Sequence, residues 1–323
     1  MRYPQTLRRC MSAALLALPL VAAAAYPDKS IEWVVPYPAG GGSDVVARIL
    51  SLPMGKTLGQ PIVINNKPGA ATSIGADYAA KARPDGYVML TGDTATMAAN
   101  PALYSKLSYN VEKDFAPVGL MARFPMILVV HPSVPAKNLT EFLAWAKKQP
   151  NGVNYATPGA GSPHHLATEL FREISGLKMV QVAYRGAAPA VQDVIGGQVP
   201  MMFVDTASGY QHIQSGRLIP IGVASPKRIA TFNTLPTLAE QGLKGFEAYA
   251  WQGLVVPAAT PPEAVATLSK ALLAALDSTE VKARFQTLGL EAIPSTPAQM
   301  AAYASSEREK WAKVIRTSNI RLD

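Results

Sequence analysis

The sequence predicts an α/β fold of two lobes, each a mainly parallel sheet flanked by helices, joined by two crossovers. Three observations lead to this prediction. Short apolar runs alternate with segments of helical period, which indicates βαβ units. The alternation stops near residue 115 and restarts near residue 140. Extended apolar segments at 115–120 and 126–130 lead from the first series to the second, and another at 246–256 follows the second series as a crossing segment.

The first series forms lobe 1. Strands are expected at 31–35, 62–64 and 87–91, and helices at 43–54 and 73–83. Apolar side chains such as Val46 and Leu50 share one face of the first helix. A Pro-Asp-Gly turn at 84–86 ends the second helix. The βαβαβ order predicts a parallel sheet.

The second series forms lobe 2. Helices are expected at 140–148, 163–174 and 188–195, and strands at 153–156, 180–183, 199–204 and 219–224. Three further helices at 262–276, 280–288 and 297–316 are expected to pack back on lobe 1. We assign residues 26–124 plus 249–323 to lobe 1 and 125–248 to lobe 2. The crossovers are expected near 123–128 and 249–254.

Residues 1–25 have the pattern of a cleavable signal peptide, which predicts a periplasmic protein. Arg2, Arg8 and Arg9 precede an apolar run at 11–20, and an Ala-x-Ala site ends at Ala25. Cleavage removes these three arginines, so the net charge falls from +8 to +5. It also removes Cys10, the only cysteine, which leaves neither a disulfide nor a thiol nucleophile.

The loop after the first strand is the first candidate site. It reads Tyr-Pro-Ala-Gly-Gly-Gly-Ser-Asp from Tyr37 and places the amides of Ala39, Gly40 and Gly41 at the start of a helix. Such amides bind anions without a charged side chain, and ligands of open α/β sheets sit at the carboxyl ends of strands. Ser43 is expected to cap the helix. A tight strand–helix turn with an N-cap explains the same residues equally well.

Asp44 argues against an anion beside this helix. It must point away, be capped by amides, or meet a cationic part of the ligand. A second loop at 65–73 also enters a helix through small residues, with Lys67 as a more ordinary solvated loop residue. A third loop at 91–96 is rich in hydroxyls, which are usually caps and turns.

Lobe 2 offers a similar loop at 157–165. Gly159 and its neighbours precede Ser162, the expected N-cap, and Pro163, the first helical residue. Of the adjacent histidines His164 and His165, one is expected to form a hydrogen bond at the helix end and the other to be exposed. Arg185 and Asp205 follow further strands. Arg185 offers a counter-charge to a second carboxylate, and Asp205 an acceptor for a ligand hydroxyl or water; a solvated arginine and a turn aspartate are the ordinary interpretations.

Motifs of catalysis and cofactor binding are missing from the sequence. The four histidines show no metal-ligand spacing, and Gly55-Lys56-Thr57 lacks the first glycine of a P-loop. Neither a G-x-S-x-G elbow nor a dinucleotide fingerprint is present. Lysines and arginines are scattered, so no nucleic-acid surface is indicated. We therefore expect a protein that is not an enzyme, with no cofactor and no metal.

Several motifs, in order, resemble a known family over the whole chain after residue 25. They are IEWVVPYPAGGGSDVVAR, NNKPGAATSIGA, RPDGYVMLTG, ATPGAGSPHHLATELF, VAYRGAAPAVQDVIGGQVPMMF and LPTLAEQGL. The chain resembles the extracytoplasmic solute receptors of tripartite tricarboxylate transporters, the Bug family of proteobacteria. The resemblance implies a two-lobed periplasmic-binding-protein fold, type II-like, which closes on a small carboxylate and delivers it to membrane permease subunits. It also implies that the receptor is a monomer.

The resemblance also implies which residues bind the ligand. Amides and hydroxyls of lobe 1 would hold the carboxylate, and lobe 2 would reach the far end partly through water. The matching positions are Ala39, Gly40, Gly41, Ser43, Ala70 and Ala71 in lobe 1 and Thr157, Gly159, Ser162, His165 and Asp205 in lobe 2. Tyr37 and Arg185, which lie in loops that follow strands, are two further candidates for ligand binding. The ligand is a dicarboxylate, an aromatic acid or an amino acid. Two other functions remain open: a ligand-sensing partner of a membrane sensor protein, and a secreted hydrolase using Ser162 and His165.

Overall fold

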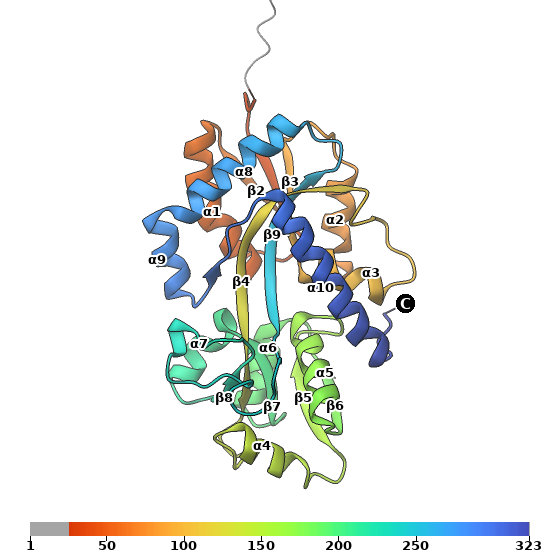
Figure 1. The fold of residues 1–323 in the computed structure, drawn as a ribbon, viewed down its shortest axis with the longest axis vertical. Coiled ribbons are helices and arrows are strands. Elements are labelled where there is room, and N and C mark those ends of the chain that lie inside the picture. Colours follow the sequence, from red (N-terminus) through yellow and green to blue (C-terminus); the bar gives the residue numbers. More distant parts are fainter. Residues whose placement is uncertain (1–25, 323) are drawn as a thin grey trace, which may run out of the picture.

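The computed structural model describes residues 26–322, which form two lobes stacked along the long axis (Figure 1). The expected signal peptide, 1–25, lies outside the described residues. No helix within 26–322 combines the length and apolar character of a membrane span. The predicted α/β class and two-lobed fold are confirmed.

Three parallel strands form one side of the upper sheet. They are β1 (Ile31–Val35), β2 (Ile62–Asn66) and β3 (Val88–Asp93), in the order β2-β1-β3. Helices α1 (Gly42–Leu58) and α2 (Ser73–Ala80) connect them. The buried face of α1 carries Val46, Leu50 and Met54, which pack with Trp33 of β1 in one cluster. This 3.6-residue spacing is the pattern that predicted the helix.

Two long antiparallel strands connect the lobes. β4 (Phe115–Val130) pairs with β9 (Tyr249–Pro257) from Phe115↔Pro257 to Pro125↔Tyr249. Beyond that point β4 pairs with β7 and β8 of the lower lobe instead. The two short segments expected at 115–120 and 126–130 are therefore one continuous strand. Its change of partner falls at Pro125–Met126, inside the predicted first crossover.

The lower lobe repeats the pattern of the upper one. Its strands are β5 (Val153–Thr157), β6 (Met179–Ala183), β7 (Met201–Asp205) and β8 (Ile219–Val223), and its helices are α4 (Leu139–Ala146), α5 (Pro163–Ser175), α6 (Ala187–Ile195) and α7 (Thr206–Gln214). β5 is parallel to β6 and to β7, whereas β4 is antiparallel to β7 and β8. Helix α7 was not expected from the sequence.

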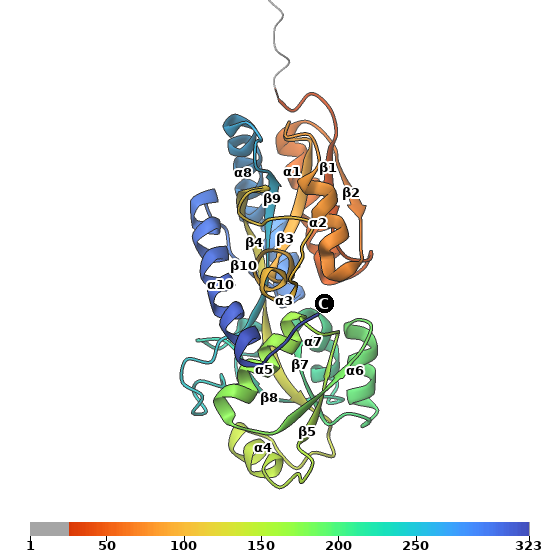
Figure 2. The same ribbon diagram turned by 90° about the vertical axis from the view of Figure 1, so that its right-hand side faces the viewer.

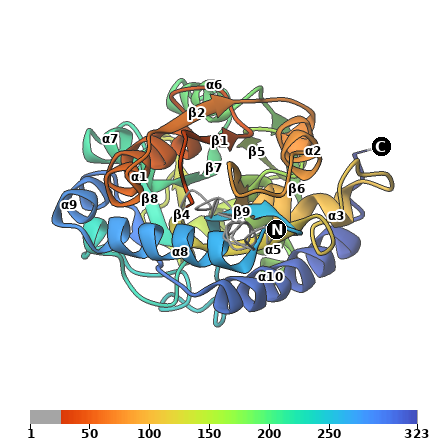
Figure 3. The ribbon, with the colours of Figure 1, turned by 90° about the horizontal axis from the view of Figure 1, so that it is seen from above.

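The C-terminal helices pack back on the upper lobe, as predicted. They are α8 (Pro262–Asp277), α9 (Thr279–Thr287) and α10 (Pro297–Thr317), with the short strand β10 (Glu291–Ala292) before α10. α8 packs against α1 and β4, and α10 against β4, α3 (Asn100–Leu103) and α5. α8 and α10 thus cover one side of β4 and β9, while β1 and β2 lie on the other (Figures 2 and 3).

Strand directions place the loops of the two lobes opposite each other. β4 runs from the upper to the lower lobe, and β9 runs back antiparallel to it. β3 is antiparallel to β9, so β1, β2 and β3 all point toward the lower lobe. β7 is antiparallel to β4, so β5, β6 and β7 point toward the upper lobe. The carboxyl ends of both sets of parallel strands therefore face the boundary between the lobes.

Candidate ligand-binding site

The first loop, from β1 to α1, exposes the backbone near the start of a helix. Ala39, Gly40, Gly41 and Gly42 are all exposed. The predicted cap was wrong: α1 begins at Gly42 with Gly41 as an extended N-cap, and no side chain caps it. Ser43 is instead buried in the first turn, where its Oγ accepts a hydrogen bond from Gln252 Nε2 at 2.7 Å. The first amides of α1 therefore keep no capping side chain.

Asp44 is satisfied within the protein. Its carboxylate accepts hydrogen bonds from Gly40 N at 2.8 Å, Arg48 Nε at 2.8 Å and Asn66 Nδ2 at 3.0 Å, and it is only 2% exposed. Burial by itself raises the pKa of this carboxyl, but the bonds from Arg48, Gly40 and Asn66 lower it overall. The Gly40 amide is therefore engaged by Asp44, and Asp44 no longer indicates an amino group on the ligand.

The second loop contains a left-handed turn built from residues other than glycine. Ala70, Ala71 and Thr72 have φ values of 44°, 47° and 78°, directly after Gly69 at 126°. Each such residue with a Cβ atom costs about 1–2 kcal/mol. Successive amides in such turns form concave anion-binding nests. Ala70 and Ala71 are exposed and α2 begins directly afterwards at Ser73, so this turn offers a second group of amides.

Tyr37 and Asp93 connect the first and third loops. The Tyr37 hydroxyl donates to Asp93 Oδ2, and Asp93 Oδ1 accepts from Thr96 N at 2.9 Å. Burial raises the pKa of the Tyr37 hydroxyl and that of the Asp93 carboxyl. Tyr37 thus connects the first loop to the third loop through its hydrogen bond with Asp93. The hydroxyl-rich third loop forms a buried π-helical turn, Thr94–Ala99, which Asp93 caps.

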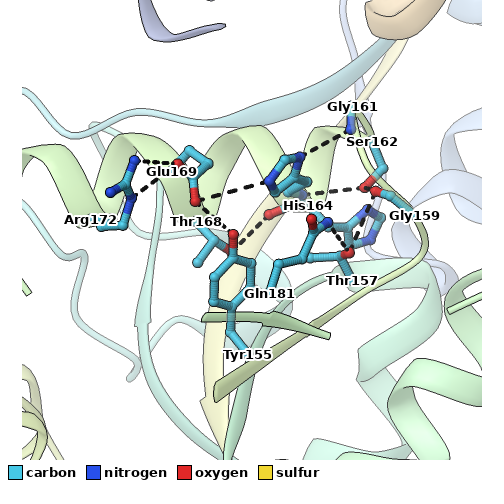
Figure 4. Close-up of polar contacts among 11 residues, drawn as sticks. Tyr155, Thr157, Gly159, Gly161, Ser162, His164, Thr168, Glu169, Arg172 and Gln181 are labelled. Carbon is cyan, nitrogen blue, oxygen red and sulfur yellow. Dashed lines mark hydrogen bonds and ion pairs between the residues drawn. The ribbon is translucent and has the colours of Figure 1, made fainter. Parts of the chain in front are cut away.

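In the lower lobe, the loop before α5 has the capping predicted from its sequence (Figure 4). Ser162 Oγ accepts from His165 N at 3.3 Å and donates to Gly159 O at 2.8 Å, and Pro163 is the first helical residue. Thr157 is fully buried, and its Oγ1 accepts from Gln181 Nε2 at 2.8 Å. This loop is therefore fixed by its own hydrogen bonds.

Both histidines of this loop are buried, which corrects the expectation that one is exposed. His164 Nε2 donates to Asp205 Oδ2 at 2.9 Å. His165 Nδ1 accepts from Gly161 N at 3.0 Å, and its ring stacks on Tyr155. Adjacent helical side chains point about 100° apart. Both directions are nevertheless covered, because β5 packs against His165 and the start of α7 packs against His164. Burial lowers the pKa of His165, so its imidazole is neutral.

Asp205 is engaged in hydrogen bonds within the protein, whereas Arg185 is exposed. Asp205 caps α7 by accepting from Ser208 N at 2.8 Å, and burial raises its pKa less than the bonds from His164 and Ser208 lower it. Arg185 is exposed and forms no ion pair with any carboxylate of residues 26–322. The residues on either side of Arg185 donate backbone hydrogen bonds to Thr157 O and Pro158 O, which keeps Arg185 beside the α5 loop.

The geometry does not support a serine nucleophile. The Ser162 hydroxyl is bonded to Gly159 O, and the His165 ring is bonded to Gly161 N, so neither hydrogen bond joins Ser162 to the imidazole. Within 26–322, no group of three histidine, cysteine, aspartate or glutamate residues is placed to hold a metal ion.

Two cavities lie away from these loops. One of about 580 Å³ lies between the chain from Pro101 to Asp114 and Arg308. Another of about 240 Å³ lies between residues 229–231 and 282–292. Neither is lined by a residue predicted to bind ligand, so the candidate site is defined by the facing loops alone.

Sequence reasoning missed two residues that hold these loops. Gln252 lies on β9 and donates to Ser43, a residue far away in the chain. Asn100 follows the π-helical turn and donates to Ala71 O. Neither belongs to a local motif, and only the pairing of β3 with β9 and the packing of α3 bring them to the site.

Comparison with known proteins identifies relatives along most of the chain. The profile of the Tripartite tricarboxylate transporter family receptor matches residues 46–320. Protein BugT of Bordetella pertussis is 34% identical over 303 residues, covering 94% of this chain and 93% of that protein. The solved structure of R. palustris Rpa4515 with adipate has a TM-score of 0.85 and 31% identity, covering 92% of this chain and 100% of that chain. MatC from Rhodopseudomonas palustris with bound malate has a TM-score of 0.80 and 33% identity, covering 90% and 100%.

Proposed function

Because the chain belongs to the tripartite tricarboxylate transporter receptor family and its Bug branch, we propose a specific way in which it holds its ligand. The chain is a carboxylate-binding solute receptor, and receptors of this family are periplasmic binding proteins rather than enzymes. We propose that one carboxylate group of the ligand binds between the first and second loops of the upper lobe. The observation that carries this proposal is the left-handed turn at Ala70–Thr72 beside the uncapped start of α1.

The proposed carboxylate is held by backbone amides. The amides of Ala39, Gly41 and Ser43 act from one side and those of Ala70 and Ala71 from the other. Gly40 is left out because its amide donates to Asp44. A charge-assisted hydrogen bond contributes about 1.5–3 kcal/mol. Micromolar binding corresponds to about 8 kcal/mol, so a few such bonds suffice without a salt bridge.

The far end of the ligand meets the lower lobe. Arg185, exposed and without an ion-pair partner in the described chain, is the proposed partner of a second carboxylate. Gly159 and Ser162 are partly exposed and reach the ligand through ordered water, because their own hydrogen bonds hold them within the loop. Thr157 is fully buried and acts indirectly, by fixing the loop through its hydrogen bonds with Gln181 and Gly159. His165 and Asp205 also act indirectly: each holds a loop in place through a hydrogen bond inside the protein.

Ligand binding closes the lobes about β4 and β9, the two strands that cross between them. We propose that the closed receptor is a monomer, exported through the signal peptide at 1–25, which delivers its ligand to the permease subunits of a tripartite transporter and catalyses no reaction. A membrane sensor protein reading the same closed lobes would use the same outer surfaces. Purification of the receptor with membrane proteins in the presence of ligand separates these two partners.

Thermal unfolding with a carboxylate library tests the proposed function. Adipate and malate are the first probes, and adipamide, which lacks charge, is the matched control. At 100 times Kd a ligand stabilises the folded state by about 2.7 kcal/mol, which raises Tm by several degrees. We expect at least one carboxylate to raise Tm while adipamide leaves it unchanged. A broad library without any rise in Tm would contradict the proposal, and turnover of an ester panel would contradict the absence of catalysis.

A further inference from the structure

The left-handed turn of the second loop is held from beneath by one buried side chain. Asn100 is 1% exposed, and its Nδ2 donates to Ala71 O at 2.7 Å and to Thr72 Oγ1 at 3.2 Å. It therefore contacts the backbone and the side chain of two of the three left-handed residues. The left-handed region is unfavourable for Ala71 and Thr72 because each carries a Cβ atom, so the turn needs an external restraint.

Two further groups fix Asn100 and the turn. Thr96 Oγ1 donates to Thr72 Oγ1 at 2.9 Å, and the Tyr109 hydroxyl donates to Thr96 O at 3.0 Å while accepting from Asn100 Nδ2 at 3.2 Å. Burial raises the pKa of Tyr109 to about 12, so its hydroxyl keeps its proton. Thr96 lies in the π-helical turn, and Asn100, four residues later, begins α3. π-Helical turns are often found at functional sites.

We propose that Asn100 is a positioning residue for ligand binding: it holds Ala70–Thr72 in the left-handed conformation, with the amides aimed at the carboxylate before the ligand arrives. This inference rests on the proposed function. Without the Nδ2 donor, the turn relaxes to ordinary dihedral angles in the free protein, and binding must then restore the strained form. Affinity falls because the free state has changed, although Asn100 does not touch the ligand.

The test compares Asn100→Asp with the wild-type full chain in calorimetric titrations of adipate and malate. Aspartate has nearly the same shape but lacks the N–H donor, and its oxygen faces Ala71 O. We expect Kd to rise at least tenfold. Val118→Ala is the matched control, because Val118 is fully buried in β4 and belongs to a different hydrophobic cluster from Tyr109 and the residues around Asn100. It should lower Tm similarly and leave Kd unchanged.

A rescue variant separates positioning from general stability. Glycine adopts positive φ without strain, so Ala71→Gly should recover part of the lost affinity when it is added to Asn100→Asp, whatever it does to Tm. Tyr109→Phe provides a milder test should Asn100→Asp fail to fold, with an expected two- to fivefold rise in Kd.

The possible outcomes distinguish the two proposals. Absence of carboxylate binding by the wild type refutes the proposed function. Binding by the wild type together with an unchanged Kd in Asn100→Asp, or in Tyr109→Phe if that is the variant that folds, refutes the positioning role alone. An equal rise in Kd for Val118→Ala would also refute it, because the effect would then follow stability.

Discussion

Replacing Asp44 by asparagine tests whether the first loop is built around a buried carboxylate. Oδ2 of Asp44 accepts from Gly40 N and Arg48 Nε, and Oδ1 accepts from Asn66 Nδ2. Asparagine keeps one of the two oxygens, so its amide NH2 faces a donor on the other side whichever way the side chain turns. Asp44→Asn therefore loses at least one charge-assisted bond and leaves a buried donor without an acceptor.

The expected cost follows from these contacts. A hydrogen bond to a charged group contributes about 1.5–3 kcal/mol, and an unsatisfied buried donor adds a desolvation cost. We expect Asp44→Asn to lower the free energy of unfolding by about 2–4 kcal/mol in urea titrations followed by tryptophan fluorescence. Arg48→Gln is the matched control: the Arg48 side chain is 53% exposed, and such pairs contribute about 1 kcal/mol or less.

The pH dependence gives a second readout of the same carboxylate. Its folded-state pKa is lowered, so its stabilisation is fully present above the unfolded value of about 3.9 and is lost as pH falls toward the folded value. Asp44→Asn should lack this acid-induced loss. An Asp44→Asn protein as stable as the Arg48→Gln protein, with the wild-type acid profile, would refute the interpretation of Asp44 as the centre of the loop.

Three further changes probe the lower lobe. In calorimetric titrations, Arg185→Gln should weaken the affinity for a dicarboxylate about tenfold, or 1.4 kcal/mol, and leave the affinity for a monocarboxylate of similar size unchanged. Equal losses of affinity for both ligands would contradict a role of Arg185 at the second carboxylate. Ser162→Ala should lower the free energy of unfolding by about 1 kcal/mol through loss of the α5 N-cap, and a loss near zero in urea titrations would argue against that cap. The pKa of His165 is lowered by burial, so its contribution to stability should decrease as pH falls through about 6.5. Between pH 7.5 and 5.5, the Tm of His165→Gln should therefore fall less than the Tm of the wild type. An identical pH profile of Tm for the two proteins would contradict a buried neutral imidazole.

Much of the fold was predictable because local patterns agree with it. The 3.6-residue spacing of Val46, Leu50 and their neighbours matches the buried face of α1. Ser162-Pro163 predicted the start of α5 correctly. Helix α7 could not be found this way, because its sequence, TASGYQHIQ, is mostly polar and carries no apolar stripe.

The site was less predictable because distant residues decide its details. Ser43 has the chemistry of an N-cap, but Gln252 of β9 binds its hydroxyl. Thr94 is typical of a turn, yet its hydroxyl accepts from Trp251 N at 2.9 Å within a buried π-helical turn. The left-handed turn at Ala70–Thr72 gave no signal, since alanine and threonine rarely adopt it and the restraint comes from Asn100.

Backbone amide NMR of the 15N-alanine- and 15N-glycine-labelled receptor tests the central claim most directly. In a titration with adipate or malate to saturation, the amide signals of Ala39, Gly41, Ala70 and Ala71 should move downfield, as expected for hydrogen bonds to a carboxylate. The Gly40 signal should move less, because its amide is already bonded to Asp44. Saturated binding that leaves the signals of Ala70 and Ala71 in place would contradict the amide site between the two loops.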